Sequence, residues 1–340
     1  MAAVFRVARF LVMAVLVLIV SLAGALQSAR VDGSVPSVDV PWPAPEANSH
    51  IEHRYQVVGR IRLLLFWAGA ANVGGARLSL RSDRQARSVS LLIGSDPQRA
   101  PRGINEWGYI RESVDDDVTS VFAIRPKTGR ESPPEADAAR TRADGLAKFE
   151  VLCSTVTAMD AVSRTAAVGV SRAATYENVD QVLDAVDGAS WDTHRVSRPR
   201  DVAPGFLTAL NTMLHASSTA LQAHQRTTWP RSSYVYKDTV YDFIPRRIEH
   251  VEQLQTVSGV FRNLLRTDVV LRNRKTGSVD NFSIAYGVDP PLAGVPVYVR
   301  YQPNWWFKVE LVLDDSQRVP PDPEDEAIMQ RRIAATCSPQ

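Results

Sequence analysis

The chain has 340 residues, of which 45% are hydrophobic and 22% are charged, a composition that excludes disorder of the whole chain. Lys and Arg number 39 against 37 Asp and Glu, and the first 25 residues contribute two Arg and no acidic residue. The rest of the chain is therefore close to neutral, whereas nucleic-acid-binding proteins normally carry a basic excess, so we expect no nucleic-acid partner.

The N-terminal segment has the features of an export signal. Arg6 and Arg9 precede an uncharged apolar run at residues 10–26, and Ala23-Gly24-Ala25 has the small-x-small form of a cleavage site. The run is long for a signal peptide and short for a membrane span, so a cleaved signal and a retained transmembrane anchor both stay open. Either one predicts an exported protein, periplasmic or anchored to the inner membrane and facing outward, with this segment as its membrane contact.

The composition then changes along the chain. Residues 27–50 are rich in Pro, Ser and Asp, which is typical of an extended linker after the segment at 1–26. We expect a single β-rich exported domain at residues 51–315, with a helical insertion at about 178–225, and a C-terminal tail at 316–340.

Alternation of apolar and polar residues predicts strands along most of this domain. The first, Glu52–Ala68, becomes apolar on both sides at Phe66 and Trp67, and Asn72–Gly75 predicts a hairpin turn after it. Further strands are expected at Arg77–Arg81, Ser88–Gly94, Trp107–Arg111, Val118–Ile124, Leu146–Met159 and Ala161–Ala174.

Helical patterns are confined to the middle and the end of the chain. Val179–Val186 is expected to form a helix with Asn178 as its N-cap. Gly205–His224 has apolar residues at helical spacing and would cover one face of a sheet. Gly188–Pro199 is polar and predicts a loop, whereas Glu324–Arg332 predicts a tail helix whose acidic start and basic end suit the helix dipole.

The last third of the chain contains the clearest strand patterns. In Trp305–Asp314, Phe307 and Val309 alternate with Lys308 and Glu310, which predicts a strand with one buried and one exposed face. The expected fold class is mainly β (α+β). It consists of a curved antiparallel sheet or open β-barrel covered by one or two helices, after an N-terminal signal or membrane-anchor helix.

Four motifs occur in order along this region: Thr256–Phe261 (T-x-x-G-x-F), Phe282–Tyr286, Val295-Pro296-Val297 and Lys308–Leu313. With them, residues 234–313 resemble a family of uncharacterised bacterial exported proteins, and Tyr55–Gly59 with Gly74–Ala76 resembles the first hairpin of that family. The resemblance implies an open β-barrel with a covering helix, similar to lipoprotein-carrier and lipoprotein-receptor proteins of the bacterial envelope. It implies no activity. Gly259 of the first motif is expected at positive φ.

The chain contains two cysteines, Cys153 and Cys337. In an exported protein an even number permits one disulfide, which would tie the C-terminal tail to the middle of the chain. Two independent thiols are the alternative, and the sequence does not decide between them.

We find no catalytic, metal or cofactor site in the sequence. His50 and His53 are the closest pair of histidines, and neither H-E-x-x-H nor G-x-S-x-G occurs. Asp115-Asp116-Asp117 contains clustered carboxylates of the kind that bind Ca²⁺, but without further spaced ligands it is typical of a solvated turn.

Aromatic residues form the most distinctive group. Phe66, Trp67, Tyr301, Trp305 and Phe307 are candidates to line an apolar cavity for a lipid or another hydrophobic small molecule. Packing in an ordinary core is the alternative for the same residues.

Three functions fit these patterns. The first is an envelope protein that binds a hydrophobic ligand, such as a lipid or acyl chain, or a lipoprotein, in the cavity of a curved sheet. The second is a structural or interaction protein of the envelope with a filled core and no ligand. The third, a hydrolase, ranks last because no nucleophile and base come together in the sequence.

Overall fold

The computed structural model describes residues 49–63, 66–82, 86–100, 103, 105–115, 118–127, 146–199, 201–222, 229–304, 307–314 and 323–338. The predicted signal or anchor segment and most of the predicted linker lie outside these ranges. Within them, no helix is both long and apolar enough to cross a membrane.

Fourteen strands form one sheet in which all neighbouring pairs are antiparallel. Their bounds are β1 Ser49–Leu63, β2 Phe66–Ser82, β3 Ala86–Ser95, β4 Trp107–Asp115, β5 Val118–Pro126, β6 Leu146–Val156, β7 Asp160–Ser171, β8 Trp191–Ser197, β9 Ser232–Tyr236, β10 Thr239–Gln255, β11 Val260–Asn273, β12 Val279–Gly287, β13 Pro296–Asn304 and β14 Phe307–Leu313.

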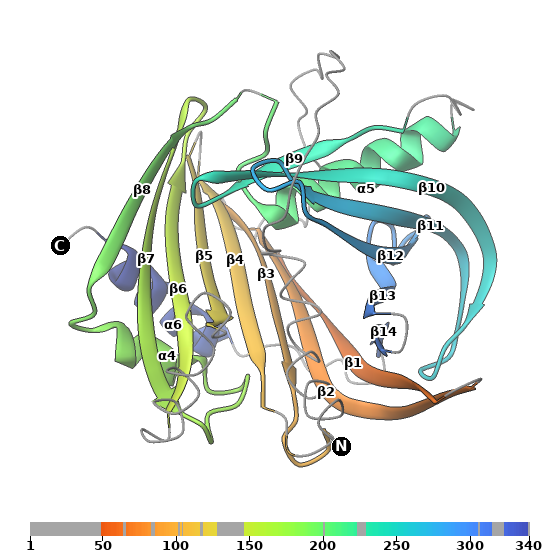
Figure 1. The fold of residues 1–340 in the computed structure, drawn as a ribbon. Coiled ribbons are helices and arrows are strands. Elements are labelled where there is room, and N and C mark those ends of the chain that lie inside the picture. Colours follow the sequence, from red (N-terminus) through yellow and green to blue (C-terminus); the bar gives the residue numbers. More distant parts are fainter. Residues whose placement is uncertain are drawn as a thin grey trace.

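The described chain begins in the middle of the sheet, because β1 pairs with β2 on one side and with β14 on the other. The sheet continues from β2 to β8 in one direction and from β14 back to β9 in the other. The edge strands β8 and β9 are therefore consecutive in the chain and are joined through the helix α5 (Phe206–Gln222). The sheet curls but stays open between β8 and β9 (Figure 1), which confirms the prediction of a mainly β protein built on an open antiparallel sheet.

One face of the sheet packs against α5 and is called the inner face; the opposite face is the outer face. α5 lies along β9 and β10 (Figure 1), and Ala209 and Met213 of α5 are fully buried in the core on the inner face. Phe206 of α5 meets Tyr234 of β9 and Phe243 of β10 edge to face, with ring centroids 5.5 and 5.4 Å apart. The predicted helix therefore exists and covers one face of the sheet.

A second core lies on the outer face of β3 to β7. Two helices contribute to it, α4 (Val179–Val186) and α6 (Pro323–Cys337). α4 buries four apolar side chains, and α6 lies beside it and buries Ile333. Because both faces of β4 to β6 are covered, these strands contain runs of consecutive buried residues, and buried and exposed residues do not alternate along them.

The predicted hairpin turn at Asn72–Gly75 is wrong. The strand β2 runs through these residues, with a register irregularity opposite Val57 and Gly59, and the pairing of β1 with β2 extends to Leu63 opposite Phe66. Gly74 occurs there because the neighbouring backbone is close: a Cβ on Gly74 would lie 2.1 Å from the carbonyl oxygen of Gly94. A Cβ on Gly75 would lie 3.2 Å from the Tyr176 hydroxyl. The motif segments of the first hairpin do pair, with Tyr55 opposite Ala76 and Val57 opposite Gly74.

The prediction of a half-buried last strand is also wrong. Glu310 is 4% exposed and Val312 is 2% exposed, so β14 is buried on both faces. The Glu310 carboxylate is compensated by Arg60 Nε at 2.8 Å and Lys308 Nζ at 2.9 Å. Such pairing explains how an acidic residue is accommodated in a central strand.

Two smaller corrections concern the segment around α4. The predicted loop at Gly188–Pro199 contains the edge strand β8, whose polar residues stay at the surface because one side of the strand is unpaired. Asn178 stands at the N-cap position of α4 without capping it; its Oδ1 accepts hydrogen bonds from Thr175 instead. Gly259 has a φ of +143°, which confirms the predicted positive φ.

Candidate functional site at the seam of the sheet

The two edges of the sheet approach each other at a seam formed by the segment between β8 and α5. Arg198 holds this segment in place: its Nε donates to the carbonyl oxygen of Val202 at 2.7 Å and its Nη1 to that of Thr157 at 2.5 Å. Ala203 then forms a bridge with Tyr234 of β9. A single chain segment therefore connects the β6–β7 turn to the opposite edge of the sheet.

Glu150 of β6 is one of two buried carboxylates at the seam. Its Oε1 accepts a hydrogen bond from Arg125 Nε at 2.7 Å, and its Oε2 contacts Lys237 Nζ at 2.7 Å. Tyr236, the last residue of β9, donates its hydroxyl to Oε1 at 3.2 Å. Because Lys237 lies in the turn between β9 and β10, this cluster joins the inner face of β6 to the far edge of the sheet.

The electrostatics of Glu150 favour its charged form. Burial alone would raise its pKa, but the hydrogen bonds and positive charges of Arg125 and Lys237 outweigh burial and lower the pKa to about 2. The carboxylate is therefore ionised at neutral pH. A buried carboxylate with two cations bound is held firmly and is a poor proton acceptor, which favours a structural role over general-base chemistry.

Glu112 of β4 is the second buried carboxylate and caps α5 from a distance. Its Oε1 accepts from the Leu207 amide at 2.6 Å, and its Oε2 accepts from the Thr208 amide at 2.9 Å and the Thr208 hydroxyl at 2.6 Å. The first turn of α5 has no acidic residue of its own, so a strand supplies the anion that its unpaired amides require. Burial raises the pKa of Glu112, and the hydrogen bonds from Thr208 and Leu207 offset part of that effect.

Close packing fixes the start of α5 on Glu112. A Cβ on Gly205 would lie 2.4 Å from Glu112 Cδ and 2.5 Å from its Oε1. A side chain at this position would therefore displace the carboxylate or the helix. The seam thus fastens α5 to the inner face at one end, while apolar contacts hold the rest of the helix.

A third acidic group lies further along the inner face. Asp280 of β12 accepts a hydrogen bond from the Tyr301 hydroxyl at 3.0 Å. Burial raises the pKa of Asp280 to about 6, and the hydrogen bond from Tyr301 offsets part of that rise. A carboxyl group in this range can change protonation near neutral pH. Tyr301, which donates to it, is itself buried.

Of the five predicted cavity residues, the structure describes the side chains of Tyr301 and Phe307. Tyr301 and Phe307 are 2% and 1% exposed and belong to the core on the inner face. Phe66 and Trp67 begin β2, but their side chains lie outside what the structure describes, as does all of Trp305. Their proposed role in ligand binding stays a prediction.

The other candidate groups stay apart. Asp115 ends β4 at the surface, and the rest of the triplet lies outside the described residues. Among the residues described, no group of three His, Cys, Asp or Glu is placed to hold a metal ion. Of the two arrangements left open for the cysteines, the structure has the Cys153–Cys337 disulfide.

Sequence reasoning missed Glu112 and Glu150. Each had a weak signal, because each occupies a position that alternation assigns to the inner face, two residues from a buried Ile110 or Leu152. A charged residue at an inward position calls for a partner, but nothing local shows that the partners are the α5 amides and Lys237, which lie far along the chain.

The chain matches no protein-family model and no curated protein sequence. Among solved structures it is similar to a protein of Parabacteroides distasonis ATCC 8503 that is provisionally classed as a lipoprotein. The identity is 12%, the match covers 82% of this chain and 99% of the other, and the TM-score is 0.27. A similarity this low supports no inference about function, and no family is assigned.

Proposed function

We propose that the protein is an exported interaction or structural protein of the cell envelope that works through its outside surfaces, with α5 filling its inner face. The observation that carries this proposal is the burial of α5 against the sheet, where Phe243, Met213 and Val297 are all fully buried. A carrier of hydrophobic ligands needs open apolar volume at such a face. Tyr301 and Phe307, two candidates for a cavity lining, are buried in the core on the inner face, which supports a filled face.

Export rests on the apolar run at residues 10–26, and the disulfide is compatible with it, since disulfides persist in oxidising compartments. A reporter fused after Gln340 should be active outside the cytoplasm only. Reporter activity in the cytoplasm would show that the chain is not exported.

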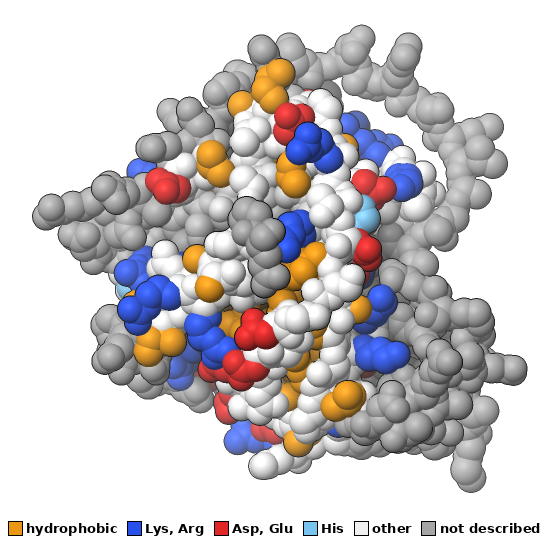
Figure 2. Space-filling model, turned by 90° about the vertical axis from the view of Figure 1, so that its left-hand side faces the viewer, with side chains coloured by type: hydrophobic (Ala, Val, Ile, Leu, Met, Phe, Trp, Pro, Cys, Tyr) orange, Lys and Arg blue, Asp and Glu red, His pale blue; other side chains and the backbone are white. Residues whose placement is uncertain are grey.

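One face of the molecule supports a role in protein contacts. Figure 2 shows the side of the molecule that lies on the left in Figure 1, where hydrophobic side chains form a central strip between charged groups of both signs. A mixed surface of this kind lacks the single-sign field that attracts a polyanion.

A carrier function for lipid or acyl chains is the second candidate, and one observation favours it. Asn211 Nδ2 and Ser217 Oγ of α5 are buried without a hydrogen-bond partner among the described residues. Unpaired buried polar groups each cost about 1–3 kcal/mol, so the seating of α5 is not fully satisfied. A ligand that displaced α5 would relieve this cost.

Native mass spectrometry of the exported protein, followed by lipid extraction, separates the two functions. The proposal predicts a protein without bound lipid, whose melting temperature is unchanged by added fatty acids or phospholipids. A co-purifying acyl species, together with a lipid-induced rise in melting temperature, would overturn the filled-core function and establish the carrier.

A further inference from the structure

The helix α6 is held to the outer face by few apolar contacts. Among its described side chains Ile333 alone is buried, at 8% exposed, and Met329 packs half-buried against the same core, although α6 has 15 residues. The neighbouring α4 has 8 residues and buries four apolar side chains. Because stabilisation by burial follows the apolar area removed from water, packing retains α6 much less strongly than α4.

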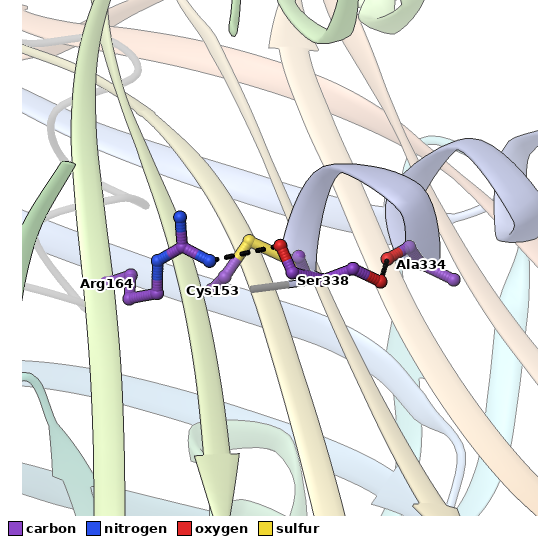
Figure 3. The surroundings of a disulfide bond; sticks show 5 residues. Cys153, Arg164, Ala334 and Ser338 are labelled. Carbon is purple, nitrogen blue, oxygen red and sulfur yellow. Dashed lines mark hydrogen bonds between the residues drawn. A yellow bond between two sulfur atoms is a disulfide. The ribbon is translucent and has the colours of Figure 1, made fainter. Parts of the chain in front are cut away.

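The polar contacts of α6 lie at the solvent. Arg332 pairs with Asp180 at 2.6 Å and also with Asp184, both on α4, and the two acidic side chains are 55% and 71% exposed. Arg164 of β7 donates from Nη1 to the carbonyl oxygen of Ser338 at 3.1 Å (Figure 3). Exposed ion pairs and hydrogen bonds contribute little to stability, so these contacts orient α6 rather than retain it.

The disulfide between Cys153 and Cys337 is the covalent attachment of α6 (Figure 3). It joins the last residue of α6 to the middle of β6, across a sequence separation of 184 residues. A cross-link over so long a segment restricts the freedom of the tail far more than the contacts described above.

The surface beside this cross-link is apolar. Phe122, Val151 and Cys153 belong to the core of the outer face, with Val182 of α4 and Ile333 of α6. We propose that α6 is a redox-released cover: reduction of the disulfide frees α6 and uncovers an apolar strip of β6 and α4. This inference concerns the outer face and does not depend on whether the inner face binds a ligand.

The chemistry is a thiol–disulfide exchange with a dithiol reductant. Cys153 is 4% exposed whereas Cys337 is half-buried, so the reductant thiolate attacks Sγ of Cys337. The sulfur–sulfur bond breaks, and its electron pair leaves on Sγ of Cys153, which takes up a proton. The second thiol of the reductant then displaces Cys337 as a thiol, and the reductant is left as a disulfide.

The test uses the full exported chain with and without dithiothreitol, after titration has shown two free thiols in the reduced sample. Tryptic cleavage after Arg331 and Arg332 reports release of α6, and fluorescence of an apolar dye reports the uncovered strip. We expect cleavage to accelerate by about tenfold or more on reduction, as for a locally opened segment, with a parallel rise in dye fluorescence. The far-ultraviolet circular dichroism of the sheet should stay unchanged.

Two variants complete the test. Cys337→Ser should show rapid cleavage and dye binding without reductant. Arg332→Ala keeps the disulfide, so its tryptic cleavage after Arg331 should be as slow as in the native chain. Unchanged cleavage and dye binding in both the reduced chain and Cys337→Ser would overturn the proposal. Cooperative loss of the sheet on reduction would overturn it as well, because the disulfide would then support the whole fold.

Discussion

The helices α5 and α6 have 17 and 15 residues and cover opposite faces of one sheet, yet different forces hold them. α5 is buried along the inner face and receives a carboxylate cap from Glu112. α6 buries Ile333 and is tied by a disulfide. The comparison shows that a covering helix can be integral to a core or can be fastened onto it, and that the two kinds should respond to different changes.

Truncation inside α5 should have the largest effect. Met213 is fully buried, so Met213→Ala should lower the free energy of unfolding by about 2–5 kcal/mol, from lost burial and the cavity left behind. His215, two residues away, is exposed, and His215→Ala should change the free energy of unfolding by less than about 0.5 kcal/mol. Urea denaturation measures both. Similar small losses would mean that α5 is only attached, as α6 is.

Acid should weaken the Glu150 cluster while leaving the disulfide intact. The folded-state pKa of Glu150 is lowered to about 2 from its ordinary 4.5, so the ionised group stabilises the fold above about pH 4.5, and this is lost as pH falls toward 2. The loss for this buried group is about 3 kcal/mol. Denaturation curves from pH 7 to pH 2 should show it.

Glu150→Gln provides the control for that measurement. The variant should be less stable at pH 7 and should lose less stability between pH 4.5 and pH 2 than the native chain does. An equal loss of stability in both proteins would mean that groups other than Glu150 cause the acid sensitivity. Asp280, whose pKa is raised to about 6, acts in the opposite direction, since its protonation favours the folded state as pH falls below that value.

The close approach of Gly205 and Glu112 predicts a smaller effect, in which substitutions of the two residues are not additive. Gly205→Ala places a Cβ against the carboxylate and should cost about 1–3 kcal/mol through overpacking. In Glu112→Ala the obstacle is absent, so adding Gly205→Ala should cost little more. A double-mutant cycle from urea denaturation measures this coupling. Strictly additive losses of unfolding free energy would mean that Gly205 does not interact with the Glu112 carboxylate.

The surface ion pairs of α6 should matter least. Arg332→Ala removes contacts with Asp180 and Asp184, which are both largely exposed, and should lower the free energy of unfolding by less than about 1 kcal/mol. Urea denaturation of the disulfide-bonded protein checks this. A loss comparable to that of Met213→Ala would mean that polar contacts hold α6, contrary to its assignment as a tethered cover.

The sequence predicted the elements better than their connections. Alternation located most strands, the family resemblance located the T-x-x-G-x-F turn, and helical spacing located α4 and α5. β8 was missed because an exposed edge strand lacks alternation, and the first turn was misplaced because Asn72–Gly75 has turn composition inside a strand. Pairing of β1 with β14 and the contacts of Glu112 and Glu150 join distant segments, so no local pattern encodes them.

Hydrogen exchange of the full chain, measured before and after reduction of Cys153–Cys337, tests the central contrast most directly. The account predicts that reduction accelerates exchange of the α6 amides by about a hundredfold or more, while the amides of α5 change by less than about twofold. Exchange that is unchanged in α6, or that accelerates in both helices together, would contradict the conclusion that packing holds α5 and the disulfide holds α6.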